Sequence, residues 1–110
     1  MWEIKYMEEA LEELLGLDKG IRAIVGKGIK KVSENPLPNT EGGLGKPLGN
    51  KRGNNLTGFF KIKYKDIGIR VVYTLDRVNK IMIVIVASAR SENECYDLAK
   101  ERKTQEKKSR

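Results

Sequence analysis

The chain contains no histidine and only one cysteine, Cys95. A lone cysteine cannot form an internal disulfide, and without histidine or a second cysteine the usual set of zinc ligands is missing. We therefore expect no disulfide, no metal site and no cofactor.

Long apolar runs are also missing, since no stretch approaches the roughly 20 residues that a membrane-spanning helix needs. The N-terminal segment MWEIKYMEEALEELL lacks the basic and then apolar order of a signal peptide. The sequence thus predicts a cytoplasmic protein with no membrane association. With 110 residues it has the length for a single domain with one core, which we place at residues 1–110.

Charge is distributed unevenly along the chain. Residues 1–18 carry six acidic side chains and one lysine, a sum of −5, so a net charge of +7 leaves +12 on the other residues. Such a field favours a polyanionic partner, either nucleic acid or the ribosome surface, or an acidic protein that neutralises it. Solubility alone explains a basic composition about equally well.

The N-terminal third predicts one strand and two helices. Residues 2–6 alternate as a short strand does, and residues 7–15 have apolar positions at helical spacing. Asp18 suits the N-cap of a second helix, which ends before Pro36 because the residue before a proline disfavours the helical conformation. The glycines of this helix predict close packing between helices; they are Gly20, Gly26 and Gly28.

Residues 37–57 are rich in glycine and asparagine and predict a long loop. The segment matches neither G-x-G-x-x-G nor the P-loop pattern, so we set a phosphate cradle aside. Its basic residues are candidates for contacts with a nucleic-acid or ribosome backbone, although a solvated connection is an equally good interpretation. The candidate contacts are Lys46, Lys51 and Arg52, together with Lys65 in a later turn.

The stretch from Phe59 to Ala87 predicts three consecutive strands. Residues 59–64 and 69–75 have apolar side chains at alternate positions, and a turn at residues 65–68 joins them. The run 81–87 is apolar throughout, which is typical of a strand covered on both sides.

These strands also carry cations. A hairpin that buries the apolar positions of both alternating strands must place Lys61, Lys63 and Arg70 on one face, and Arg90 follows the third strand. The face offers no histidine, cysteine or paired carboxylates, but a cation cluster suits the charge that develops on a phosphodiester during cleavage. Crowding disfavours the charged form of a lysine, so one of them could accept a proton from a ribose 2′-hydroxyl. Alternation alone favours an ordinary solvent-facing strand.

The end of the chain predicts a short helix from about Glu92 to Lys103, with Ser91 and Glu94 as a capping box and a frayed basic tail at 104–110. The fold class is therefore α+β. We expect a small antiparallel sheet, made of the N-terminal strand and a three-strand meander, with the two N-terminal helices packed on one face. The other face is left uncovered.

The segment from Gly58 to Arg102 resembles the RelE family, within the RelE/ParE superfamily of bacterial type II toxin–antitoxin systems. The resemblance rests on the K-I-K strand, the G-x-R-V-V-Y strand, the apolar strand that ends in Arg90, the spacing from there to Tyr96, and a trailing A-K-x-R. The order of strand, two helices and sheet also fits.

This resemblance implies a ribosome-dependent endoribonuclease that cuts messenger RNA in the ribosomal A site without a metal and so inhibits translation. Lys61 and Lys63 match two active-site lysines, one of them a general base for the 2′-hydroxyl. Arg70 matches the arginine that stabilises the pentacovalent phosphate, and Arg90 one that stabilises the phosphate or protonates the leaving group. Tyr96 matches a tyrosine that stacks on a messenger base and supports the chemistry.

Two other interpretations remain open. A ParE-like toxin would poison DNA gyrase without cleaving anything, which leaves the cation set unexplained, and an inactive domain would only bind nucleic acid or an antitoxin. Besides the ribosome and messenger RNA, we expect a cognate antitoxin as partner. Its acidic segment or helix would cover the basic face or displace the terminal helix.

Overall fold

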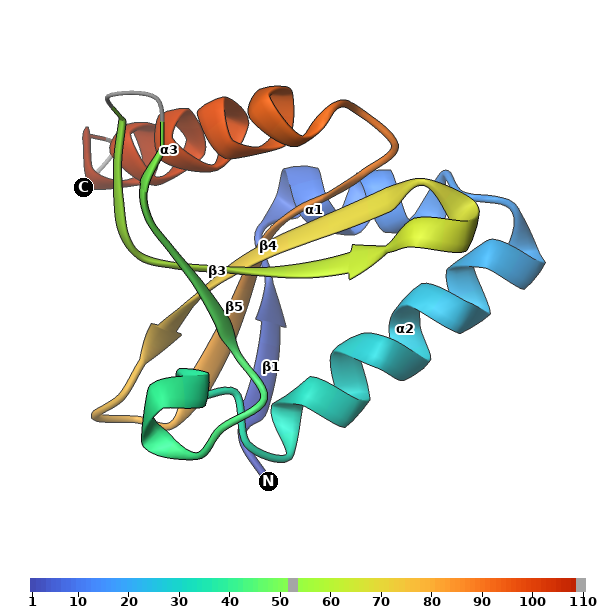
Figure 1. Cartoon of the computed structure of the whole chain (residues 1–110). Coiled ribbons are helices and arrows are strands. Elements are labelled where there is room, and N and C mark those ends of the chain that lie inside the picture. Colours follow the sequence, from blue (N-terminus) through green and yellow to red (C-terminus); the bar gives the residue numbers. More distant parts are fainter. Residues whose placement is uncertain (52–53, 109–110) are drawn as a thin grey trace.

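The computed structural model describes residues 1–51 and 54–108, which form three α-helices and one five-stranded sheet (Figure 1). Two short 3₁₀ helices, η1 (Asn39–Glu41) and η2 (Lys65–Ile67), lie in connections. None of the described helices is long and apolar enough to cross a membrane. The strands and α-helices, in chain order, are β1 (Glu3–Tyr6), α1 (Glu8–Leu15), α2 (Lys19–Ser33), β2 (Lys46–Lys51), β3 (Asn54–Tyr64), β4 (Ile69–Asp76), β5 (Ile81–Ser88) and α3 (Glu92–Lys108).

The sheet has the strand order β1-β5-β4-β3-β2. The predicted meander is confirmed, because β3, β4 and β5 pair antiparallel in sequence. The sheet as a whole is mixed, since β1 runs parallel to β5. A parallel pair needs a long crossover between its strands, and here the rest of the domain supplies it. The α+β class is confirmed, with a fifth strand that the sequence did not predict.

The predicted loop at residues 37–57 is wrong over much of its length, because β2 and the first residues of β3 form an antiparallel pair there. Glycine and asparagine gave the segment its loop character, and Gly42 and Gly49 do adopt positive φ angles of 83° and 62°. The strands form nevertheless because Leu48 and Leu56 are buried below α3. Tertiary burial therefore outweighs the local preference.

The two faces of the sheet bury separate apolar clusters. On one face, α1 and α2 pack with Phe60, Val71 and Tyr73 of the central strands, as predicted. The opposite face was expected to be uncovered, which is wrong, because α3 lies across it (Figure 1). Cys95 and Ala99 of α3 are fully buried there. They are small and few, so the polar sequence of this helix concealed its buried stripe.

The helices on the first face begin and end close to the predicted residues. Asp18 occupies the N-cap position of α2, but its side chain makes no capping hydrogen bond. The prediction that glycines mark close helix packing is wrong for Gly26, where an added Cβ would meet nothing. Gly28 does mark a close approach, but to Tyr64 of β3, whose hydroxyl donates a 2.8 Å hydrogen bond to the carbonyl of Val25. Burial raises the pKa of Tyr64 to about 12, so this hydroxyl stays protonated.

The capping box of α3 is confirmed by two reciprocal hydrogen bonds of 3.3 Å between Ser91 and Glu94. The helix is longer than predicted and continues to Lys108, so residues 104–108 of the expected frayed tail are helical, while residues 109–110 lie outside the described part. Side-chain bonds along this last stretch support the helix, such as the 2.9 Å bond from the Thr104 hydroxyl to the Lys100 carbonyl.

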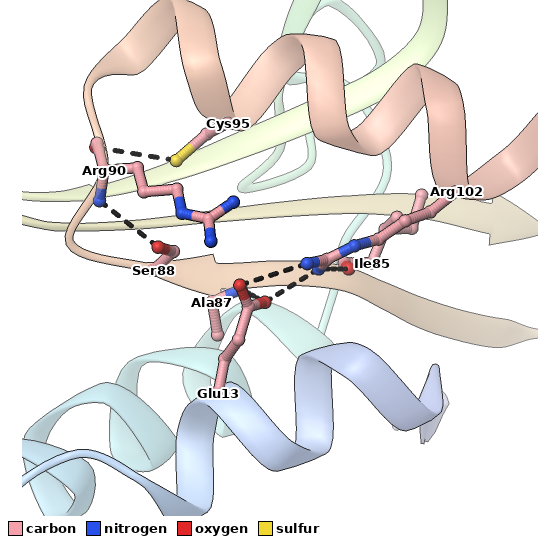
Figure 2. Close-up of polar contacts among 7 residues, drawn as sticks. All are labelled: Glu13, Ile85, Ala87, Ser88, Arg90, Cys95 and Arg102. Carbon is pink, nitrogen blue, oxygen red and sulfur yellow. Dashed lines mark hydrogen bonds and ion pairs between the residues drawn. The ribbon is translucent and has the colours of Figure 1, made fainter.

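An ion pair ties α3 to α1 across the edge of β5 (Figure 2). Arg102 donates to both carboxylate oxygens of Glu13, at 2.7 and 3.1 Å. The same two side chains satisfy backbone groups that β1 is too short to reach: Arg102 donates to the carbonyl of Ile85 at 2.8 Å, and Glu13 accepts from the amide of Ala87 at 3.3 Å. The pair therefore replaces a neighbouring strand at this edge.

Candidate functional site

The sheet register brings three of the predicted site cations onto the face that carries α3. Lys63 lies opposite Arg70 on the neighbouring strand, and Lys61 lies opposite Val72, which is buried below α3. Directly opposed residues in a sheet point to the same face. Lys61, Lys63 and Arg70 therefore share one face, as the alternation predicted.

Two of the cross-strand pairs at this site join like charges. Lys63 is paired with Arg70, and Lys46, the first residue of β2, is paired with Lys61. Like charges directly opposite one another destabilise a sheet. A strand that only faces solvent has no reason to accumulate such pairs, so the arrangement favours an anion-binding role over an ordinary exposed face.

A cleft of about 700 Å³ opens beside these side chains. It lies next to the start of β2 and to the last residues of β3, which extend beyond the pairing with β2. Four lysines line it, together with Ile24 of α2 and residues of η2; the lysines are Lys46, Lys61, Lys63 and Lys65. Two predicted nucleic-acid contacts thus lie in the same cleft as the two predicted active-site lysines. The side chain of Lys51 and all of Arg52 lie outside the described part of the chain.

Arg70 connects the hairpin to the end of β5. Its Nη1 donates a 3.2 Å hydrogen bond to the backbone carbonyl of Arg90, while its Nε is a buried donor without an acceptor among the described residues. Leaving such a donor unsatisfied costs about 1–3 kcal/mol, and a functional role is one explanation for such a group. The Arg90 side chain is exposed, and Figure 2 shows its guanidinium pointing along β5 toward the Glu13–Arg102 pair.

Tyr96 does not lie in the predicted position for stacking. The residue is only 4% exposed, within the core below α3, so its ring is not open to a base in this conformation. Its hydroxyl instead donates a 2.8 Å hydrogen bond to Oε1 of Glu92. Burial and the neighbouring Glu92 carboxylate raise the pKa of Tyr96, which keeps this hydroxyl protonated. Tyr96 therefore reaches the site through its hydroxyl.

Glu92 is a site residue that the sequence reasoning missed. The Oε1 atom that accepts from Tyr96 also lies 3.6 Å from Nζ of Lys61. The hydrogen bond from Tyr96, together with the charges of Lys61 and Lys63, holds the pKa of Glu92 below its usual range, so the carboxylate is ionised at neutral pH. Its position four residues before Tyr96 on a helix was the available signal, because such residues face each other.

The thiol of Cys95 lies next to the site but is protected. It is fully buried and contacts the carbonyl of Arg90 at 3.6 Å. Burial raises the pKa of Cys95 to about 11, so the reactive thiolate is scarce at neutral pH. No three histidine, cysteine, aspartate or glutamate side chains are grouped for a metal ion within residues 1–51 and 54–108. The chemistry offered by the described residues is that of a cation cluster, with Glu92 beside Lys61 and Asp66 at the lining of the cleft.

The fold is that of the RelE toxins. A doubly substituted Escherichia coli RelE in the free state matches with a TM-score of 0.70 and 25% identity, over 92% of this chain and 96% of that one. The toxin–antitoxin complexes RelBE of Escherichia coli and of Mycobacterium tuberculosis match with TM-scores of 0.65 and 0.62, at 23% and 22% identity. These cover 84% and 81% of this chain and 100% and 98% of the matched chains.

Sequence similarity identifies the family to which the chain belongs. No protein-family model matches it. An Escherichia coli protein described as RelE-like toxin is 32% identical over 101 residues, which is 92% of this chain and 96% of that protein. The chain therefore belongs to the RelE-like toxin family, and the predicted resemblance is confirmed.

Proposed function

We propose that the protein is the toxin of a type II toxin–antitoxin system and acts as a ribosome-dependent endoribonuclease on messenger RNA in the A site. The observation that carries this proposal is the gathering of Lys61, Lys63 and Arg70 on one face, with two like-charge cross-strand pairs beside a lysine-lined cleft. A scaffold that served only for binding a protein partner would not need this costly arrangement.

The proposed reaction is attack of a ribose 2′-hydroxyl on the adjacent phosphate. Lys61 or Lys63, after losing its own proton, accepts the 2′-hydroxyl proton as the new O2′–P bond forms. Arg70 stabilises the extra negative charge on the pentacovalent phosphate. The P–O5′ bond then breaks, and the leaving O5′ takes a proton, for which Arg90 is the candidate donor once its exposed side chain turns toward the phosphate. The products are a 2′,3′-cyclic phosphate and a 5′-hydroxyl.

Lys46 and Lys65 extend the proposed site along the RNA backbone. Both side chains are exposed and line the same cleft as Lys61 and Lys63. Lysines at such positions fix the register of a nucleic acid without reading its sequence. Tyr96 contributes through its hydroxyl and Glu92, since its buried ring cannot stack on a base in this conformation.

An antitoxin is the proposed protein partner. Two of the matched structures are toxin–antitoxin complexes of RelE-type proteins. The residues beyond position 18 have a net charge of +12, from +7 for the whole chain and −5 for residues 1–18, so an acidic antitoxin segment would complement them. Either covering the lysine cleft or displacing α3 would block the proposed site.

The test is primer extension on a reporter messenger in a reconstituted translation system. We expect the wild-type protein to cut at A-site codons only when ribosomes are present, and Arg70→Ala to lose about 100-fold or more of the cleavage rate. Lys30→Ala is the matched control, because it removes an exposed cation from α2, away from the cleft.

Each other result has a defined meaning. Equal cleavage by Arg70→Ala and Lys30→Ala would reject the site assignment. Intact messenger in every lane, from a folded protein that still arrests growth, would reject the nuclease proposal and favour a gyrase-directed toxin.

A further inference from the structure

Glu92 places a carboxylate against one of the cations of the proposed site, Lys61. It stands in the first turn of α3, and its Oε1 lies 3.6 Å from Nζ of Lys61. The same oxygen accepts the 2.8 Å hydrogen bond of the Tyr96 hydroxyl. An RNA phosphate that approaches Lys61 would be repelled by this negative charge, so Glu92 either weakens binding or must leave.

The contacts made by Oε1 are those that a phosphate oxygen would make. A phosphate oxygen is an anionic acceptor that faces an ammonium group and accepts an O–H donor, which is the environment formed by Lys61 and Tyr96. Because Tyr96 stays protonated, its hydroxyl can donate equally well to a carboxylate or to a phosphate. In the free protein the Glu92 carboxylate occupies this position.

The Lys61–Glu92 contact is built to open. At 3.6 Å it is a loose ion pair, and the two side chains are 28% and 39% exposed, so water competes with it. The backbone of this first turn is fixed independently by the Ser91–Glu94 capping box. Rotation of the Glu92 side chain alone can therefore release Lys61 without moving α3.

We propose that Glu92 is an internal substitute for the substrate phosphate, which holds Lys61 and Tyr96 in the free toxin and is displaced when RNA binds. This inference rests on the proposed function, because it takes RNA as the displacing ligand. Displacement frees the Lys61 ammonium and the Tyr96 hydroxyl at the moment a phosphate arrives, so the free toxin discriminates against weak polyanions.

Direct binding tests the inference without any cleavage. The probe is a single-stranded 2′-fluoro RNA of about ten nucleotides, which keeps the phosphates but lacks the 2′-hydroxyl nucleophile, and binding is followed by fluorescence anisotropy over a salt series. Glu92→Gln should bind about three- to fivefold more tightly than wild type at low salt. Its log–log salt slope should steepen by about 0.7, because in the wild type the displaced Glu92 carboxylate takes up a counterion that offsets the release from one phosphate contact on a single strand.

Three variants separate this role from general charge or packing. Glu101→Gln removes the same charge from an exposed position of the same helix and should bind like wild type. Tyr96→Phe keeps the buried ring but releases Glu92, and should produce a smaller gain, of about twofold. Lys61→Ala combined with Glu92→Gln should show no increase in salt slope over Lys61→Ala alone.

The inference is overturned if Glu92→Gln binds no more tightly than Glu101→Gln, or if its gain persists fully without Lys61. Loss of binding would instead make Glu92 a residue that supports RNA, and would overturn it as well. Should Glu92→Gln unfold, which circular dichroism would show, Glu92→Ala provides the same comparison. If the wild-type protein does not cleave messenger RNA on ribosomes but Glu92→Gln still binds the RNA more tightly than wild type, the inference is retained and the nuclease proposal is rejected.

Discussion

The two ion pairs that hold α3, one to α1 and one to β3, differ in almost every property. In the second half of the helix, Arg102 and Glu13 are 11% and 19% exposed and form a bidentate pair with a shortest distance of 2.7 Å. At the N-terminal end, the contact between Lys61 and Glu92 is 3.6 Å long and about a third exposed. The first pair also completes the backbone hydrogen bonds of β5, while the second makes no backbone contact.

This difference separates structure from function along one helix. A buried pair that also satisfies backbone groups cannot open without leaving several polar atoms unpaired, so it fixes α3. A loose, half-exposed pair is worth little to stability and can be exchanged for another ion. The proposed site therefore lies at the end of α3 that the fold can afford to rearrange.

The largest effect should come from breaking the buried ion pair between Arg102 and Glu13. Arg102→Ala leaves Glu13 charged and the carbonyl of Ile85 unpaired, so we expect the free energy of unfolding to fall by about 3 kcal/mol. Urea unfolding followed by circular dichroism measures it, with Lys100→Ala, an exposed neighbour, as the control. A change below about 1 kcal/mol would show that the pair does not anchor α3.

The next largest effect concerns the activity of the proposed site at the N-terminal end of α3. Lys61→Ala or Arg90→Ala should abolish growth arrest, with about a 100-fold loss of cleavage rate, because Lys61 is a candidate base for the 2′-hydroxyl and Arg90 is the candidate proton donor to the leaving O5′. The free energy of unfolding should change by less than about 1 kcal/mol, since a half-exposed cation holds little folding energy. Toxicity of these variants at expression equal to that of wild type would refute the catalytic assignment.

A smaller effect on stability is expected from the capping box at the N-terminal end of α3. Ser91→Ala removes the side chain that accepts from the amide of Glu94, and should cost about 1 kcal/mol of unfolding free energy. Ser91→Asp, which restores a capping acceptor, should recover most of the loss. If both variants lose stability equally, the capping box is not the cause.

The smallest effect is expected from removing the charge of Glu92, which tests directly how little the Lys61–Glu92 pair contributes to stability. Glu92→Gln should change the unfolding free energy by no more than about 0.5 kcal/mol at pH 7. Because the folded-state pKa of Glu92 is lowered, its stabilising contribution is present above the unfolded pKa, about 4.3, and is lost as the pH falls through the folded value. The difference between wild type and variant should therefore vanish on acidification, as urea titrations at pH 7 and pH 3 would show. A difference that stays constant would mean that the Glu92 charge is not involved.

The sequence predicted the elements whose patterns are strong and local. The alternation in residues 59–75 placed the hairpin and put Lys61, Lys63 and Arg70 on one face, and the register confirms this arrangement. The S-x-x-E pattern placed the start of α3 correctly. These predictions hold because the period of a strand and the chemistry of a cap act over a few residues.

The sequence-based predictions failed where contacts between residues far apart in the chain determine the structure. Strand β2 has the composition of a loop and is recruited by the burial of Leu48 below α3, a helix about fifty residues further along the chain. The ring of Tyr96 was predicted to face RNA, but the same burial turns it inward. Roles for Lys51 and Arg52 stay predictions, because their side chains lie outside the described part.

The sequence alone determined the α+β class, the meander and the identity of the cations, since residue type and periodicity carry that information without any long-range contact. The tertiary structure alone decided that α3 covers the second face, that Glu13 reaches Arg102, and that Glu92 stands between Lys61 and Tyr96. Contacts between side chains that are far apart in the chain depend on how whole elements pack, and packing follows from the total apolar surface buried rather than from any local pattern.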